Sequence, residues 1–165
     1  MYSMSQSGNL QELQIRDARE QDISDVAALE NSCFDTYYYR NHRFSELQFT
    51  DYLRSKRAIF LVATRKTTLI GYIAGLIRSS GSELSARVET IAVSPGLREK
   101  GVGSRLLRRF IHDAKLRGCK SIALQVATAN KSGIRFFSKL GFRKIRRLPA
   151  YYGKGFDGIL MKLGT

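Results

Sequence analysis

The sequence predicts a single α/β domain of the α+β kind, with helices flanking a mixed, mostly antiparallel sheet. Segments with strand patterns and segments with helical periodicity follow one another in the order β-α-α-β-β-β-α-β-α-β-β. The chain has 165 residues, 43% of them hydrophobic, which is enough for one sizeable core but hardly for two. We therefore expect a flexible N-terminal tail over residues 1–10 and one domain over residues 11–165.

The first part of the chain is predicted to form one short strand and two helices. Residues 13–18 alternate in polarity, as a half-buried strand does. Residues 19–34 carry an apolar stripe at helical spacing, with acidic residues near the start, where the helix dipole favours them. A second helix is expected over residues 44–55, with Ser45 as its N-cap. The stripe of the first helix consists of Ile23, Val26, Ala27, Leu29 and Glu30.

Three strands and a strongly amphipathic helix follow. Residues 58–65, 69–79 and 85–93 indicate an antiparallel meander. Residues 101–117 place apolar side chains on one helix face, and Gly118 suits the left-handed conformation that ends a helix. The opposite face is expected to be basic and exposed, with Arg105, Arg108, Arg109 and His112.

The last part of the chain adds a strand, a helix and a terminal strand pair. The strand covers residues 121–127, and the helix covers residues 130–141 with Asn130 as its cap. Residues 142–148 and 157–163 form the final pair, around a connection that reads PAYYGKGF.

The charge distribution is strongly asymmetric. The chain has 28 basic and 14 acidic residues, a net charge of +14. Residues 1–82 hold ten Lys or Arg and nine Asp or Glu, whereas residues 83–165 hold eighteen and five. A positive excess confined to one half favours an anionic partner for that half, such as a phosphorylated cofactor or nucleic acid. A generally basic surface is the alternative.

Several classes of protein are disfavoured. No apolar run is long enough to span a membrane, and the N-terminus lacks the pattern of an export signal, so we expect a cytoplasmic protein with no membrane partner. Cys33 and Cys119 have apolar neighbours, no CxxC spacing and no nearby histidine pair. We therefore expect buried thiols and no metal. Both a monomer and a homodimer are compatible with the sequence.

A turn with two glycines precedes the basic helix. The strand that ends near Val93 is followed by Pro95 and Gly96, and the helix begins near Gly101. The first N–H groups of a helix have no intrahelical partner and lie at the positive end of its dipole. Glycines allow an anion to approach them closely, so this turn is a candidate pyrophosphate site. An ordinary glycine turn before a surface helix is equally compatible with these residues alone.

The chain resembles the GCN5-related N-acetyltransferases (GNAT). The segment R-E-K-G-V-G is similar to the family motif Gln/Arg-x-x-Gly-x-Gly/Ala, and it follows ETIAVSP, which looks like the fourth strand of the family. The segment LQVATANKSGIRFFSKLGF resembles a later family block. The segments DVAALENSCF and YYGKGFDGILMKL resemble the first helix and the ending of the RimI-like branch, the ribosomal-protein-alanine and protein N-terminal acetyltransferases.

This resemblance implies transfer of an acetyl group from acetyl-CoA to a primary amine, either a protein or peptide N-terminal α-amine or a small amine. Acetyl-CoA would lie between the strand that ends at Val93 and the strand 121–127. Its pantetheine arm would pair with the backbone of Ile91, Ala92 and Val93, and Asn130 would also bond this arm. The residues expected at the pyrophosphate are Arg98, Glu99, Lys100, Gly101, Val102, Gly103 and Ser104.

Two positions depart from the RimI-like pattern. Gln125 stands where that branch typically has a glutamate base, and Phe137 stands where it has a tyrosine acid. Gln125 cannot usefully accept a proton and Phe137 cannot donate one, so neither role carries over to this chain. An α-amino group has a pKa of about 7.7 to 8.0 and is partly neutral at cellular pH, so a weak base can suffice.

Other residues are candidates for catalysis. Glu89 is expected to share a strand face with Ile91 and Val93, because side chains two apart point the same way, and it is the candidate base. A carboxylate paired with Arg87 or with a cross-strand base is the alternative for this residue. Tyr151 and Tyr152 are candidates to bind substrate or to protonate the leaving thiolate, or they pack the hairpin. Residues 37–39, all tyrosines, and His42 could form the facing wall.

Three functions remain open at this stage. The first is an active N-acetyltransferase. The second is a degenerate family member that binds acetyl-CoA without catalysis, which the departures at Gln125 and Phe137 suggest. The third is a basic nucleic-acid-binding or ribosome-binding module, which the charge of the second half suggests. The predicted strands lack the aromatic stripes of an RNA-binding sheet.

Overall fold

The computed structural model describes residues 12–34, 39, 42–98 and 100–165. Its elements follow the predicted order, with two short 3₁₀ turns added. The strands are β1 (Leu13–Asp17), β2 (Ala58–Arg65), β3 (Thr68–Ser80), β4 (Glu83–Val93), β5 (Cys119–Ala127), β6 (Arg143–Leu148) and β7 (Gly158–Gly164). The helices are α1 (Ile23–Cys33), α2 (Glu46–Arg54), α3 (Val102–Leu116) and α4 (Lys131–Lys139), and the 3₁₀ turns are η2 (Glu20–Asp22) and η3 (Pro95–Leu97). The predicted tail, residues 1–10, lies outside the described residues.

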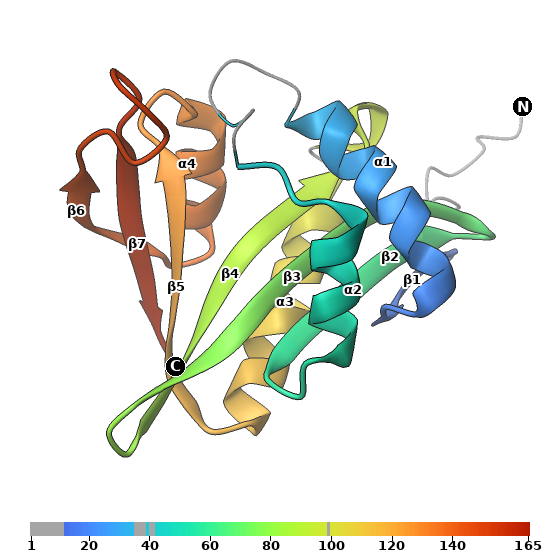
Figure 1. Ribbon diagram of the computed structural model, residues 1–165, viewed down its shortest axis with the longest axis horizontal. Helices are drawn as coiled ribbons and strands as arrows, with labels where there is room; N and C mark the ends of the chain where they lie inside the picture. Colours follow the sequence, from blue (N-terminus) through green and yellow to red (C-terminus); the bar gives the residue numbers. More distant parts are fainter. Residues whose placement is uncertain (1–11, 35–38, 40–41, 99) are drawn as a thin grey trace, which may run out of the picture.

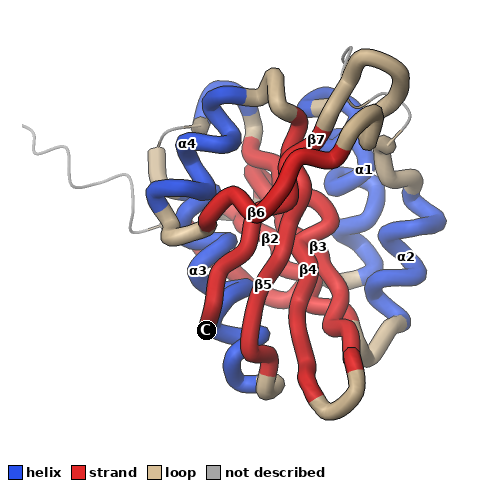
Figure 2. Tube along the Cα trace, turned by 90° about the vertical axis from the view of Figure 1, so that its left-hand side faces the viewer, coloured by secondary structure: helices blue, strands red, loops and turns tan. Residues whose placement is uncertain are grey.

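The predicted mixed α+β sheet is confirmed. In the described part of the chain, seven strands form one sheet in the order β1-β2-β3-β4-β5-β7-β6, and every neighbouring pair is antiparallel except β4 with β5. The expected meander of β2, β3 and β4 is present. Helices α1 and α2 cover one face of the sheet, and α3 and α4 cover the other (Figures 1 and 2). We call these the α1 face and the α3 face.

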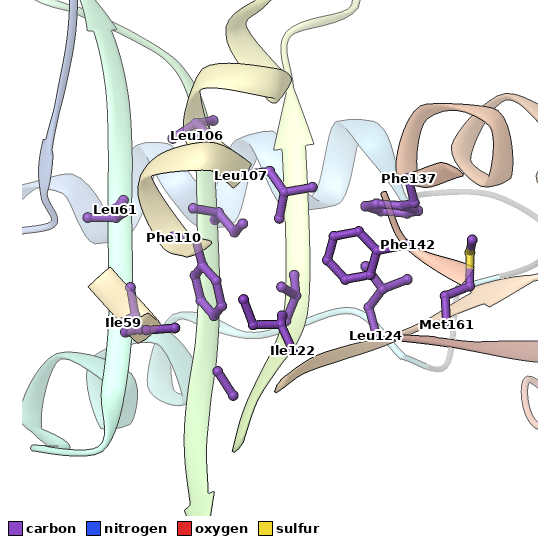
Figure 3. Close-up of a cluster of buried hydrophobic side chains, with 14 of the residues drawn as sticks. Ile59, Leu61, Leu106, Leu107, Phe110, Ile122, Leu124, Phe137, Phe142 and Met161 are labelled. Atoms are coloured by element: carbon purple, nitrogen blue, oxygen red, sulfur yellow. The ribbon is translucent and has the colours of Figure 1, made fainter. Parts of the chain in front are cut away.

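The α3 face holds the larger apolar core. Leu106, Leu107 and Phe110 of α3 are fully buried against β2 to β5, as the apolar stripe of this helix predicted. Towards β7, Phe137 and Phe142 continue the same cluster around α4 (Figure 3). Close packing of this face fixes α3 across the sheet, with its N-terminus next to the end of β4.

The α1 face holds a smaller core beneath α1 and α2. Its buried side chains include Val26 of α1, Phe49 of α2 and Val62 of β2. This cluster ends at Ala92 of β4. The described helices therefore leave the α1 face of β5, β7 and β6 uncovered (Figure 1).

Strands β4 and β5 pair over only part of their length. Parallel pairing runs from Leu84 with Cys119 to Arg87 with Ala123. β4 continues to Val93 and β5 to Ala127 without further pairs between them. The two strands diverge beyond this point (Figure 1), so the sheet is split at their C-terminal ends.

A β-bulge interrupts β4 just after the split begins. Ala74 of β3 pairs with Thr90, and the next residue, Gly75, pairs with Val88, so Glu89 is the extra residue. Bulges break the alternation of side chains between the two faces. Val88 and Ile91 accordingly contact the α3 core, whereas Thr90 contacts residues of the α1 core.

Several predicted helix ends are confirmed. The Ser45 side chain accepts a hydrogen bond from Gln48 N–H and caps α2. The Asn130 side chain accepts from Gly133 N–H at 3.0 Å and caps α4. Gly118 follows α3 with φ of 83°, the left-handed conformation expected there.

Candidate active site

The N-terminus of α3 differs from those of α2 and α4 because no side chain caps it. Gly101 takes the N-cap position with φ of 84°, a left-handed conformation that favours glycine. The N–H groups of Val102, Gly103 and Ser104 open the helix, where intrahelical acceptors are absent. These groups and the exposed side chains of Arg98 and Lys100 give the turn a positive character. Glu99 lies outside the described residues.

Close packing joins this turn to the end of β4. A Cβ atom added at Gly103 would lie 3.3 Å from Cζ of Phe136 in α4 and 3.6 Å from Cγ2 of Val93. The absence of a side chain at this glycine therefore allows α3 and α4 to approach one another at the mouth of the split. The Val93 carbonyl accepts hydrogen bonds from Arg98 Nε at 3.3 Å and Cys33 Sγ at 3.6 Å.

The opposite wall of the split is formed by the end of β5 and by Tyr39. The hydroxyl of Tyr39 accepts hydrogen bonds from Ala127 N–H at 3.1 Å and from Asn130 Nδ2 at 3.4 Å. Tyr39 belongs to the connection between α1 and α2. Tyr39 therefore lies at the C-terminal end of β5.

Aromatic rings from two distant segments meet beside the split. Tyr39 packs edge-on against Tyr152 at a centroid distance of 4.9 Å, and His42 packs against Tyr152 at 5.2 Å. Tyr151 contacts Tyr152 at 4.8 Å. Tyr39 and His42, which were expected to form the facing wall, therefore lie against the terminal hairpin. The other two tyrosines of that expectation, residues 37 and 38, lie outside the described residues.

The two hairpin tyrosines differ in burial. Tyr152 is half-buried, and burial is the main cause that raises the pKa of its phenol, with Tyr39 and Tyr151 adding to the effect. Its hydroxyl therefore keeps its proton throughout the neutral range. Tyr151 is exposed at 36%, and its hydroxyl accepts a hydrogen bond from Arg87 Nη2 at 2.7 Å.

Glu89 lies on the α1 face, which corrects the expectation that it shares a face with Ile91 and Val93. The bulge turns its side chain away from these two residues, which pack against the α3 core. Glu89 Oε1 lies 3.2 Å from Arg78 Nη2 and 3.5 Å from Arg87 Nε. The alternative expectation was a carboxylate paired with Arg87 or with a cross-strand base. Both contacts are present, because Arg78 lies on the neighbouring strand β3.

A buried carboxylate connects the bulge to the connection after α1. Glu30 is 1% exposed, and it accepts hydrogen bonds from the Tyr72 hydroxyl, from Thr90 Oγ1 at 2.9 Å and from Phe44 N–H at 3.0 Å. Burial raises the pKa of Glu30 to about 7, although the bonds from Phe44 and Thr90 and the charge of Arg43 act in the opposite direction. Thr90 follows the bulged residue directly, so Glu30 fixes the backbone at the start of the split.

The two positions that depart from the RimI-like pattern lie in different environments. Leu124 and Val126 belong to the α3 core, so Gln125 between them faces the α1 side of the split. Phe137 is buried among Phe136 and Phe142. A proton donor at position 137 is therefore replaced by a ring of the apolar core.

Two site residues were not identified from the sequence. Glu30 was noted only as part of the apolar stripe of α1, although a carboxylate in such a stripe is itself a signal of a specific buried partner. Arg87 was considered only as a partner of Glu89. Its link to Tyr151 joins residues 64 positions apart, and no local pattern predicts it.

Two open depressions lie on the surface of the described structure, and neither is lined by a residue of β4. One, of about 570 Å³, is between α1 and the start of α2, and its lining includes Asn31 and Arg43. The other, of about 600 Å³, is between the start of α4 and β6, and its lining includes Lys131 and Lys144.

In the described part of the chain, no helix is long and apolar enough to cross a membrane. Among the same residues, no three His, Cys, Asp or Glu side chains are grouped for a metal ion.

Cysteine side chains are free thiols in the described structure. Cys119 is 2% exposed, as expected, and burial raises its pKa. Cys33 is only partly buried, which corrects the expectation of a buried thiol; it is the last residue of α1.

Comparison with known proteins defines the class to which this fold and site belong. The model of the acetyltransferase (GNAT) family matches residues 23–142. The chain therefore belongs to the GNAT family, which confirms the resemblance drawn from the glycine turn and the segments around it.

Individual relatives agree with this class. An N-alpha-acetyltransferase of Sulfurisphaera tokodaii is 28% identical over 162 residues, which cover 91% of this chain and 92% of the relative. The crystal structure of Ard1 from Thermoplasma volcanium superposes with a TM-score of 0.80 at 28% identity, covering 93% of this chain and 98% of that one. The ribosomal-protein-S18-alanine N-acetyltransferase of Escherichia coli shares the fold, with a TM-score of 0.75 at 21% identity over 92% of this chain and 93% of that one. The chain spans 60% and 38% of the length of two further curated relatives.

Proposed function

We propose that the protein is an acetyl-CoA-dependent N-acetyltransferase whose acceptor is the α-amine of a protein or peptide. The observation that carries this proposal is the split between β4 and β5 beside an uncapped helix N-terminus. The family membership and the similarity to N-alpha-acetyltransferases support it.

The residues around the split fit the chemistry of acetyl-CoA. The amides of Val102, Gly103 and Ser104, with Gly101, Arg98 and Lys100, would hold the pyrophosphate, because oriented N–H groups and cations both favour an anion. Glu99 belongs to the same proposed site. The backbone of Ile91, Ala92 and Val93 pairs with β3 but not with β5, so the pantetheine arm would pair along the edge of β4 that faces β5. The Val93 carbonyl also accepts from Arg98 and Cys33. Asn130, at the start of α4, would contribute from the opposite side.

Acetyl-CoA supplies a thioester, whose carbonyl carbon is attacked by the neutral amine as an amide bond forms and the C–S bond breaks. The acceptor α-amine must first lose a proton, and with a pKa of about 7.7 to 8.0 it needs only a weak base. Glu89 is our candidate for that base, acting through water on the α1 face of the split. The cations of Arg78 and Arg87 would lower the pKa of a nearby amine further.

The hairpin tyrosines supply the complementary group. The raised pKa of Tyr152 keeps its hydroxyl protonated and makes it a weak acid, so its role would be to donate a hydrogen bond that stabilises the leaving thiolate. Tyr151, held by Arg87, would position the acceptor beside it. The aromatic wall of Tyr39 and His42 would exclude water from the reacting groups.

Release of free thiol from acetyl-CoA tests this function. We expect release with a peptide that has a free α-amine and none above hydrolysis with the same peptide acetylated at its N-terminus. Glu89→Gln should lower kcat by about 100-fold or more if this carboxylate is the base. Glu83→Gln is the matched control, because Glu83 is exposed at the start of the same strand.

Two results would contradict the proposal. The first is thermal stabilisation by acetyl-CoA without thiol release across a broad panel of peptides and small amines, which would indicate a protein that only binds the cofactor. The second is no calorimetric binding of acetyl-CoA at all. Full activity of Glu89→Gln would leave the proposed function intact but exclude Glu89 as the general base.

A further inference from the structure

Arg87 is the half-buried cation nearest the start of the split. It forms the last pair with β5, opposite Ala123, and Glu89 and Gln125 follow on the same face. Its side chain is 26% exposed. If an acceptor binds on the α1 face of the split, its side chains therefore lie close to the Arg87 guanidinium.

The described contacts of Arg87 leave most of its donors available. A guanidinium carries five N–H donors in a planar fork that matches a carboxylate. Nη2 donates to the Tyr151 hydroxyl, which is a neutral acceptor. Nε is buried and has no hydrogen-bond partner among the described residues, and its ion pair with Glu89 is long, at 3.5 Å. The donors left for a bound carboxylate are therefore those of Nη1 and the second N–H of Nη2.

The local charge is also incompletely balanced. Arg78 Nη2 donates to Glu89 at 3.2 Å, so a single carboxylate faces two guanidinium groups. On β5, the neighbouring position on this face is Gln125, which is neutral. Arg78, Arg87 and Glu89 together carry one positive charge, and a partly buried cation is stabilised by an anion in direct contact.

We propose that Arg87 binds a carboxylate of the acceptor amine and so makes the enzyme selective for acidic acceptors, an inference that rests on the proposed function. The carboxylate occupies the free donors of the guanidinium beside the Tyr151 hydroxyl. Two sources share this chemistry: an Asp or Glu side chain near the N-terminus of a peptide, and the α-carboxylate of a free amino acid.

The test compares kcat/KM for pairs of acceptors that differ only in one charge. We expect the wild-type protein to prefer a peptide with Asp at its first position over the Asn peptide, and Glu over Gln, by about tenfold or more. Moving the acidic residue to the second position locates the carboxylate along the peptide. A comparison of kcat/KM for free asparagine and asparagine amide tests whether an α-carboxylate is recognised, because the two compounds differ only in that group.

Substitutions then assign the preference to Arg87. Arg87→Met should reduce the ratio between acidic and neutral acceptors to about two or less, and Arg87→Lys should keep part of it because the charge remains without the fork. Arg143→Met removes an exposed cation of β6 and should leave the ratio unchanged. Tyr151→Phe should lower activity but retain the preference, since the guanidinium remains.

The ratio separates binding from a structural role. If Arg87 only held the hairpin through Tyr151, Arg87→Met would slow all acceptors equally. Equal kcat/KM for acidic and neutral acceptors in the wild-type protein overturns the inference while the proposed function stands. A preference that survives in Arg87→Met and Arg87→Lys also overturns it. If no acceptor of either kind is acetylated, the proposed function itself fails.

Discussion

The two faces of the sheet differ in the kind of side chains that they bury. The α3 face is filled by apolar side chains, with Phe110, Leu106 and Leu107 all fully buried. The α1 face includes a buried carboxylate, Glu30, and beside the split it carries Arg87 and Glu89. Apolar packing is non-directional, whereas buried polar groups need specific partners in fixed positions. The difference indicates that the α3 face holds the sheet together and that the α1 face orients chemical groups.

The largest expected effect is on the α3 face. Phe110→Ala should lower the free energy of unfolding by about 3 to 5 kcal/mol, because it removes a fully buried ring and leaves a cavity beside Gly75. Urea unfolding measures this loss, which should be nearly independent of pH. A loss below about 1 kcal/mol would contradict the assignment of this face as the main stabilising core.

The next largest effect is a pH dependence of stability that comes from Glu30 on the α1 face. Because the pKa of Glu30 is raised to about 7 in the folded protein from 4.5, the folded state binds a proton more tightly than the unfolded chain. The stability from this group is complete below about pH 4.5 and is lost as pH rises to about 7. The loss is about 3 kcal/mol across that window.

Glu30→Gln checks this assignment. We expect the variant to lose the decrease in stability between about pH 4.5 and 7, measured by urea unfolding at several pH values. Glu46→Gln is the control, since Glu46 is an exposed carboxylate in the first turn of α2. A pH dependence that is the same in both variants would show that Glu30 is not the titrating group.

The smallest expected effect lies at the mouth of the split, between the two faces. Gly101→Val places a branched side chain at φ of 84° and should shift the first amides of α3. We expect the Kd for acetyl-CoA to rise about tenfold, equivalent to about 1.4 kcal/mol, as measured by calorimetry. Gly81→Val is the matched control, because Gly81 has φ of 60° in the β3–β4 hairpin. If both variants weaken acetyl-CoA binding equally, the loss comes from general backbone strain and not from displacement of the first amides of α3.

The order of elements was predictable because it depends on local periodicity. The stripe that includes Leu106 and Phe110 predicted which face of α3 is buried, and Ser45 and Asn130 were predicted as caps from their positions before helical segments. The glycine turn was predicted from residues that lie within a few positions of one another. Its family motif also indicated the class of protein.

The bulge at Glu89 could not be predicted in this way. Simple alternation placed Glu89 on the face of Ile91, and the register with β3 placed it on the other. The contact of Arg87 with Tyr151 and the burial of Glu30 against Tyr72 likewise depend on segments far apart in the chain. Such contacts follow from how the strands and helices pack.

The sequence by itself determined the succession of strands and helices, the apolar face of α3 and the glycine turn before it, because each depends on residues close together in the chain. Only the tertiary structure decided which charges lie on the α1 face beside the split, how far β4 and β5 separate and where the bulge turns Glu89. The physical reason is that strand register and the contacts of buried polar groups are set between segments, and they fix the direction of side chains that local periodicity leaves undetermined.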